Sequence, residues 1–240
     1  WDKGRANFED KTFSQRQNKT RIYYGRPKVE GSDFNGLSTF YGTSFKDYES
    51  SYGAIRKIYK QESNLLVFQE LKVGQLLINE STLYSNDGTP TGVVGQRNTV
   101  LNDMNYYARE YGIGNNPESF AVYGNRKYFI DAERGAVLRL GLEGITPISE
   151  TAMQGFFSQK MSELLLINPK FNAFGGYDIY NEEYILSFET QVIGRGLPGE
   201  TIAYSDTKKR WTQLYSFLPD YMCSSMVRLV TFKNGEFYMH

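Results

Sequence analysis

A strand–turn–strand pattern recurs four times along the chain, and it constrains the fold more than any other feature. In each copy, an apolar and aromatic run is followed by a short polar turn and a second run that ends on an apolar residue. The clearest copy is KYFIDAERGAVLRLG at residues 127–141, where residues 131–135 carry the turn chemistry. The other copies are residues 65–79, 201–215 and 230–238, and the last has Asn234-Gly235, a typical hairpin dipeptide, at its turn. Four approximate copies indicate a repeated β-unit.

The spacing of these hairpins predicts the fold class. Units of roughly 40 to 60 residues with three or four antiparallel strands favour β-propeller blades, with a β-sandwich as the alternative. We therefore predict an all-β, mainly antiparallel fold, an incomplete or irregular β-propeller with a helical insertion near 150–167. Residues 1–20 are polar and are expected to form an extended arm or linker. The propeller portion is expected over 21–240, with blade-like units at about 52–84, 119–148, 183–217 and 228–240.

Several segments outside the hairpins have readable patterns. RIYY at residues 21–24 predicts a first strand, and residues 101–111 fit either a short amphipathic helix or a strand. Residues 85–96 carry turn dipeptides and are expected to be a loop, and residues 218–225 are expected to cross between units. The helical insertion has Ser149 as a candidate N-cap and Pro169 beyond its end.

Composition excludes several classes of function. The 240 residues include 27 basic and 27 acidic side chains, whereas dedicated nucleic-acid binders and membrane-surface proteins usually carry a basic excess. The only histidine is His240 and the only cysteine is Cys223. An intrachain disulfide is therefore impossible, and His- or Cys-dependent catalysis and metal sites are disfavoured. We expect no cofactor.

The ends of the sequence bear on targeting. No apolar run approaches the ~18 residues needed to cross a bilayer, and the first residues, WDKGRANFED, lack the apolar region of a signal peptide. The sequence begins without methionine and stops in what reads as mid-strand. We therefore expect it to be an excerpt from a longer protein.

Three aspartates are candidate carboxylate sites. Asp131 and Asp206 occupy matching places at the ends of strands in two of the hairpins. They could line one face as acid and base or bind a cation, but an Asx turn that fixes the hairpin is favoured at both positions. Asp178 with Glu182 or Glu183 would suit a glycosidase only at a suitable carboxylate separation, which sequence does not give.

One tight basic cluster, Lys208, Lys209 and Arg210, is followed directly by Trp211. Cations beside an aromatic residue can contact phosphates, so this cluster is a candidate interface or DNA-channel site. A solvated turn is the favoured alternative. The abundant tyrosines and Trp211 are expected to serve mostly as packing residues, with some at subunit interfaces.

A series of short phrases resembles the β-propeller tail proteins, of nozzle or muzzle type, of short-tailed crAss-like bacteriophages. The similarity covers roughly residue 20 to the end and is carried, in order, by TRIYY (20–24), YGAI (52–55), LLVFQ (65–69), PES (117–119), YFIDAERGAV (128–137), GITPIS (144–149), GYDIYNEEY (176–184) and WTQLYSFLPDYM (211–222). The resemblance implies an oligomeric ring surrounding the DNA exit channel, without catalytic residues to carry over.

The leading hypothesis is thus a non-enzymatic virion structural protein of the phage tail, assembled in the host cytoplasm. Its expected partners are further copies of itself in a ring, neighbouring tail proteins and double-stranded DNA in transit. Zero net charge suits a lumen that does not grip DNA, because basic linings bind phosphates tightly. A glycan-binding propeller module is the alternative, and a carboxylate-dependent glycoside hydrolase is the third hypothesis.

Overall fold

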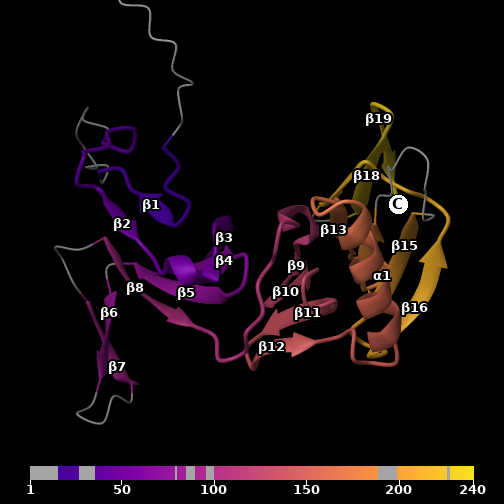
Figure 1. Ribbon diagram of the computed structural model, residues 1–240, viewed down its shortest axis with the longest axis horizontal. Helices are drawn as coiled ribbons and strands as arrows, with labels where there is room; N and C mark the ends of the chain where they lie inside the picture. Colours follow the sequence, from indigo (N-terminus) through magenta and orange to yellow (C-terminus); the bar gives the residue numbers. More distant parts are fainter. Residues whose placement is uncertain are drawn as a thin grey trace, which may run out of the picture.

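The computed structural model describes residues 16–26, 36–78, 80–84, 90–95, 100–188, 199–225 and 228–240. Their larger sheets are all antiparallel and follow one another along the chain (Figure 1). Sheet I comprises β3 (Ile55–Gln61), β4 (Asn64–Gln69), β5 (Val73–Ile78) and β8 (Leu101–Tyr106). Sheet II comprises β9 (Ala121–Tyr123), β10 (Arg126–Asp131), β11 (Ala136–Gly141) and β12 (Gly144–Pro147). Sheet III comprises β13 (Ala173–Asp178), β14 (Glu183–Phe188), β15 (Glu200–Ser205) and β16 (Arg210–Tyr215). Sheet IV comprises β17 (Tyr221–Ser224), β18 (Leu229–Lys233) and β19 (Glu236–Met239).

Smaller elements complete the described chain. A two-stranded sheet of β1 (Arg21–Tyr23) and β2 (Phe45–Asp47) lies at the N-terminal end, and β6 (Glu80–Tyr84) pairs with β7 (Pro90–Gly95) in a hairpin between β5 and β8. The helices are η1 (Ser50–Tyr52), η2 (Pro117–Ser119) and α1 (Gln154–Ile167). Among the described residues, no helix has the length and apolarity needed to cross a membrane.

All four predicted hairpins are present, as β4–β5, β10–β11, β15–β16 and β18–β19. In β10, Phe129 lies in the core shared with sheet I, whereas Tyr128 and Ile130 lie in the core shared with sheet III. Successive side chains of a strand point to opposite faces of its sheet. The middle strands read as continuous apolar runs because both of their faces are covered.

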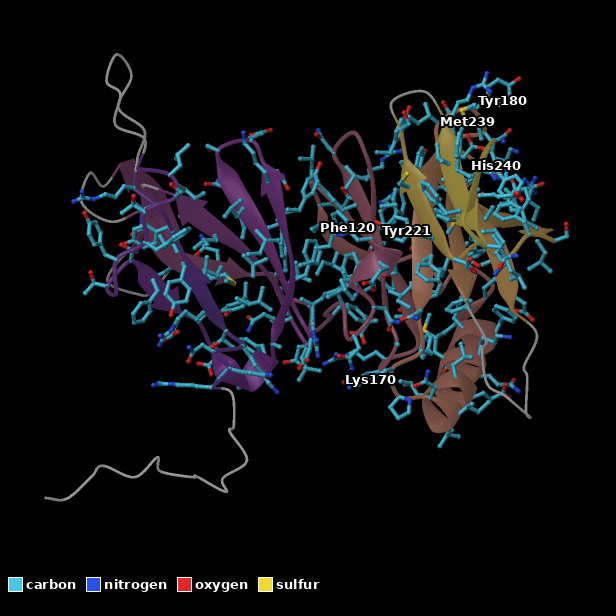
Figure 2. All side chains as sticks on the ribbon, turned by 90° about the horizontal axis from the view of Figure 1, so that it is seen from above. Phe120, Lys170, Tyr180, Tyr221, Met239 and His240 are labelled. Atoms are coloured by element: carbon cyan, nitrogen blue, oxygen red, sulfur yellow. The ribbon has the colours of Figure 1, made fainter. Side chains whose placement is uncertain are left out.

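The sheets pack face to face in chain order. Sheets I and II share one apolar core, which Phe120 borders (Figure 2), and sheets II and III share a second with α1. Sheets III and IV share a third core, in which Phe174 and Ile185 meet Met222 and Leu229. The result is a row of packed sheets.

The first strands of sheets II, III and IV converge. β13 contacts both β9 and β17, and β9 and β17 also approach each other to within 8 Å between Cα atoms. A Cβ on Gly175 would lie 1.9 Å from the Ser119 carbonyl oxygen, and a Cβ on Gly176 would lie 2.5 Å from Cδ1 of Leu229. The two glycines therefore permit close approach on opposite faces of β13.

Three local predictions need correction. Residues 101–106 form strand β8, so the helical option for this segment is wrong, because pairing with β5 overrides a weak helical spacing. Residues 90–95, predicted as loop, form β7, whereas 85–89 and 96 lie outside the described residues. Residues 221–224, predicted to cross between units, pair with β18 as β17.

The predicted helix near 150–167 is confirmed, but its predicted cap is wrong. The helix begins at Gln154 after Met153, and no side chain caps its N-terminus. Ser149 Oγ instead accepts a hydrogen bond of 3.2 Å from the backbone N–H of Val137 on β11. This serine fixes the exit from sheet II rather than the start of α1.

Candidate functional site

Four turns of sheets II and III gather at one end of the two sheets, and we call them the shared rim. They are residues 124–125, 142–143, 179–182 and 206–209. An ion pair of Arg126 with Asp206 and a ring stack of Tyr123 on Tyr177 hold the two sets of turns together. Tyr180, one of the labelled residues in Figure 2, is among the most exposed side chains of this rim. Asp178, Asp206 and the basic cluster lie at this rim, whereas Asp131 lies at the opposite end of β10.

Asp206 is the centre of a charged cluster between the two sheets. Its side chain is only 3% exposed, and it pairs with Arg126 and, at 2.7 Å, with Nη1 of Arg139. Arg139 also pairs with Glu143 on its own sheet. Burial acts to lower the pKa of Arg139, but the hydrogen bond and charge of Asp206 more than offset it and the pKa is raised. The ion pairs of Asp206 therefore tie the end of β15 to β10 and β11.

The Asx turn predicted at Asp206 is thus wrong, since this carboxylate binds arginines of the neighbouring sheet. A signal was present in the sequence. Arg139 interrupts the apolar strand AVLRLG, and a charged residue in a strand buried on both faces requires a partner. The pairing itself could not be read because Arg139 and Asp206 are 67 positions apart.

Stacked tyrosines extend the contact between sheets II and III from the Asp206 cluster into the core. Tyr177 stacks on Tyr123 at 4.3 Å and on Tyr128 at 5.6 Å, and Tyr128 stacks on Tyr184 at 5.0 Å between ring centroids. Tyr184 Oη donates a hydrogen bond of 2.7 Å to the Ser119 carbonyl. Burial raises the pKa of the Tyr128, Tyr177 and Tyr184 phenols, which therefore remain protonated and serve packing.

The other two aspartates close turns. Asp131 accepts backbone hydrogen bonds from Gly112 at 3.0 Å and from Arg134 at 3.1 Å, and the Arg134 guanidinium adds an ion pair. Burial raises the pKa of Asp131 despite these bonds. Asp178 accepts hydrogen bonds from the backbone of Tyr180 and the side chain of Asn181. The predicted Asx turn is confirmed at Asp131, and Asp178 closes a turn that was not predicted.

The three cations of the basic cluster are exposed, whereas the Trp211 side chain that follows them packs inside the protein. Lys208, Lys209 and Arg210 are exposed at the β15–β16 turn, and none forms an ion pair with a carboxylate of the described residues. Lys209 has φ of 49°, in the left-handed region, which fixes the turn. These three cations remain available to a partner.

The Trp211 side chain packs against helix α1 and sheet III instead of lying with the cations. Its ring lies 4.5 Å from Phe157 of α1 and 5.2 Å from Tyr204, and its Nε1 donates to the Ile148 carbonyl at 3.2 Å. It therefore fastens the helix and the end of β12 to sheet III and does not lie beside the cations as a stacking platform.

A groove of about 550 Å³ runs beside this turn, bordered by Lys208, Arg210 and Trp211. It also contains Glu183, whose carboxylate accepts hydrogen bonds from Thr212 and Gln213. A buried carboxylate repels phosphates, so an anion would meet the exposed turn rather than the groove. Within the described part of the chain, no group of three or more His, Cys, Asp or Glu side chains is placed to hold a metal ion.

A comparison with known protein families identifies the family of this chain. The model of the family described as Crassvirus muzzle protein matches residues 5–235. The chain belongs to this family. It is therefore a structural protein of a bacteriophage tail that assembles with other tail components, as the sequence resemblance implied. No curated protein matches the chain.

Family membership agrees with the chemistry of the rim. Its charged and aromatic groups connect sheets II and III, and the cations of the β15–β16 turn face outward. A partner that binds the described rim would therefore contact its turns.

Proposed function

We propose that this chain is a non-enzymatic β-propeller component of the tail muzzle, arranged with further copies in a ring around the DNA exit channel. The observation that carries the proposal is the face-to-face packing of successive antiparallel sheets whose first strands converge. Propeller blades have this arrangement around their axis. In this proposal, sheets I to IV are blades and the polar residues 1–20 form an arm.

The DNA passage lies outside the propeller axis. β9 and β17 approach each other to within 8 Å between Cα atoms although β13 lies between them in the chain. A DNA duplex is wider than its major groove, which alone measures about 12 Å. A passage for DNA is therefore built between several copies of the chain, with the propellers as its wall.

The basic turn is the part of the rim suited to contact with this passage or with a neighbouring tail protein. Lys208, Lys209 and Arg210 are exposed and carry no described ion pair. Three cations per copy attract DNA weakly and in a salt-dependent manner, which orients a moving duplex without arresting it. The zero net charge of the chain supports the same interpretation.

The structural use of the carboxylates supports a non-enzymatic role. Asp131 and Asp178 close turns, and Asp206 binds two arginines of the adjacent sheet. A general acid or nucleophile must be free to reach a substrate, and each of these groups is occupied. The muzzle copies would fold in the host cytoplasm and join neighbouring tail proteins there.

Cryo-electron microscopy of purified particles tests the proposal. The expected result is a rotationally symmetric ring at the distal end of the tail, with this chain in its wall and an axial channel wide enough for a duplex. A Lys208→Ser/Lys209→Ser variant should assemble the same ring and eject DNA with altered salt dependence. Particles that lack such a ring, or in which the chain sits away from the channel, would contradict the proposal.

A further inference from the structure

The groove beside the β15–β16 turn, which we call the turn groove, contains charges of both signs. Glu183 is only 3% exposed there, and its carboxylate accepts hydrogen bonds from neutral groups, the Thr212 hydroxyl at 2.8 Å and the Gln213 amide at 3.2 Å. Lys208 and Arg210 border the same groove, and neither forms an ion pair with a carboxylate of the described residues. The charges of the turn groove are therefore not neutralised by one another.

A second groove of the rim shows the opposite arrangement. It has a volume of about 410 Å³ and is bordered by Arg126, Leu142 and Glu143. Arg126 pairs with Asp206, and Glu143 pairs with Arg139, so its charged groups serve the contact between sheets II and III. The cations of the turn groove have no such role in the described fold and are available to a ligand.

The side chains around the turn groove indicate the class of ligand. Its volume of about 550 Å³ lies within the usual range for small-molecule sites, about 300–1,000 Å³. Such sites are mostly apolar, but here the bordering side chains other than Trp211 are polar or charged: Asn181, Glu183, Lys208, Arg210, Thr212 and Gln213. An apolar ligand would remove water from these groups without replacing its hydrogen bonds. A ligand rich in hydroxyl groups replaces them, because each hydroxyl both donates and accepts.

The positions of the charges define the ligand further. An ionised carboxylate offers about four acceptor positions, and Tyr215 Oη adds a third neutral donor to Glu183 at 3.4 Å. Glu183 can therefore accept a further hydroxyl, whereas it repels a ligand anion. An anionic group would lie instead against Lys208 and Arg210 on the exposed side, where a guanidinium can bind a carboxylate through two parallel hydrogen bonds.

We propose that the turn groove binds an acidic saccharide, a sugar unit that carries both hydroxyl groups and a carboxylate, such as a uronic acid. Its hydroxyls would bond to Glu183, Asn181 and Gln213, and its carboxylate would pair with Lys208 and Arg210. This binding goes beyond the proposed muzzle ring and does not depend on it. Duplex DNA is the rival ligand of the two cations, and the experiments below separate the two.

A glycan array probed with full-length protein tests the proposal. Each acidic glycan is printed beside a neutral counterpart in which the carboxylate has been reduced to an alcohol. Binding to acidic glycans should be at least about tenfold tighter than to their counterparts, because a charge-assisted hydrogen bond is lost. An array without bound glycans, or equal binding to both members of each pair, would overturn the proposal.

Variants titrated with the tightest acidic glycan test the two parts of the groove. Arg210→Gln should weaken acidic-glycan binding about tenfold and leave binding of the neutral counterpart unchanged. Glu183→Gln should weaken both, because it replaces an acceptor oxygen by a donor. Lys170→Gln is the matched control, since this exposed cation precedes β13 and Figure 2 shows it far from Tyr180 of the rim. It should keep the full affinity.

Binding of duplex DNA to the same variants separates the rival ligand. Duplex phosphates would meet only the exposed cations, so Arg210→Gln should weaken duplex binding and Glu183→Gln should not. If no acidic glycan binds and Arg210→Gln weakens duplex binding, the turn is a DNA contact and the saccharide proposal is overturned. Particles without a ring would instead overturn the proposed function and leave the turn groove unaffected.

Discussion

The close approach of the first strands depends on Gly175, and replacing this residue by alanine tests the architecture directly. Its Cβ would lie 1.9 Å from the Ser119 carbonyl oxygen, whereas real Cβ contacts essentially never fall below 3.0 Å. The obstacle is backbone and cannot rotate away. Sheets II and III would have to separate by roughly 1 Å at this point, and the hydrogen bond from Tyr184 Oη to the same carbonyl would be strained.

The expected loss follows from these two effects. Overpacking a core typically costs about 1–3 kcal/mol, and weakening a buried hydrogen bond costs about 1–3 kcal/mol. Alanine loses less conformational entropy than glycine on folding, which offsets about 0.5–1 kcal/mol of this loss. The Gly175→Ala variant should therefore lose roughly 2–4 kcal/mol, which lowers the melting temperature of a chain of this size by about 5–15 °C.

Thermal melting followed by far-UV circular dichroism measures this loss, with two companion variants. Gly176→Ala should cost less, because its Cβ would meet Cδ1 of Leu229, the end of a side chain that can rotate. Gly155→Ala is the control, since this helical glycine has no heavy atom within 4 Å of the added Cβ and alanine favours helix by up to about 1 kcal/mol. A Gly175→Ala protein that melts within about 2 °C of the natural one would refute the packing of β13 described above.

Three further predictions concern individual ion pairs and the packing of Trp211. Asp206→Asn removes the buried carboxylate from Arg139, which keeps only the exposed Glu143, and should cost about 3 kcal/mol in urea unfolding, at the low end for broken buried pairs. The Glu143→Gln variant should cost less than about 1 kcal/mol, because Glu143 is exposed. Trp211→Ala should cost about 3–5 kcal/mol in the same assay without changing the charge of the rim, and an effect below 1 kcal/mol would contradict its anchoring role. The hydrogen bond from Arg21 holds the pKa of Asp47 below its usual value, so this pair stabilises the fold above about pH 4, the pKa of an unfolded aspartate, and its contribution disappears as the pH falls through the lowered pKa. Melting temperatures between about pH 6 and 2 should therefore fall less steeply for Asp47→Asn, and an unchanged acid slope would contradict the pairing.

The hairpins could be predicted from the sequence because each is encoded locally. Asn234-Gly235 supplies both positive φ angles of its turn, and Asp131 closes its own turn within a few residues. Helix α1 was also predictable, since Phe156, Phe157 and Leu164 recur at helical spacing and Pro169 follows the helix. Local chemistry therefore fixed which segments pair with their neighbours in the chain.

The contacts between sheets could not be predicted in the same way. Asp206 and Arg139 are 67 positions apart, and nothing local distinguishes a carboxylate that closes a turn, as at Asp131, from one that reaches another sheet. Residues 101–106 show the same limit, because only the position of β5 decides between helix and strand there. The basic cluster could be located from the sequence. The direction of the Trp211 side chain could not, because it depends on contact with Phe157 of α1, which is distant in the sequence.

The chemistry of the sheet junctions fits the proposed role of the chain as a wall component of the muzzle. At the converging first strands, Gly175 and Gly176 allow backbone to pack on backbone, and at the rim Asp206 joins two sheets by charge. Both devices resist sliding of one sheet on the next, because close packing and directed ion pairs each specify a single register. With these groups committed between sheets, the exposed turns of the rim are a described surface that remains for partners. The proposed role, which is to hold shape while DNA passes, requires a rigid interior, and the contacts between sheets II and III supply it.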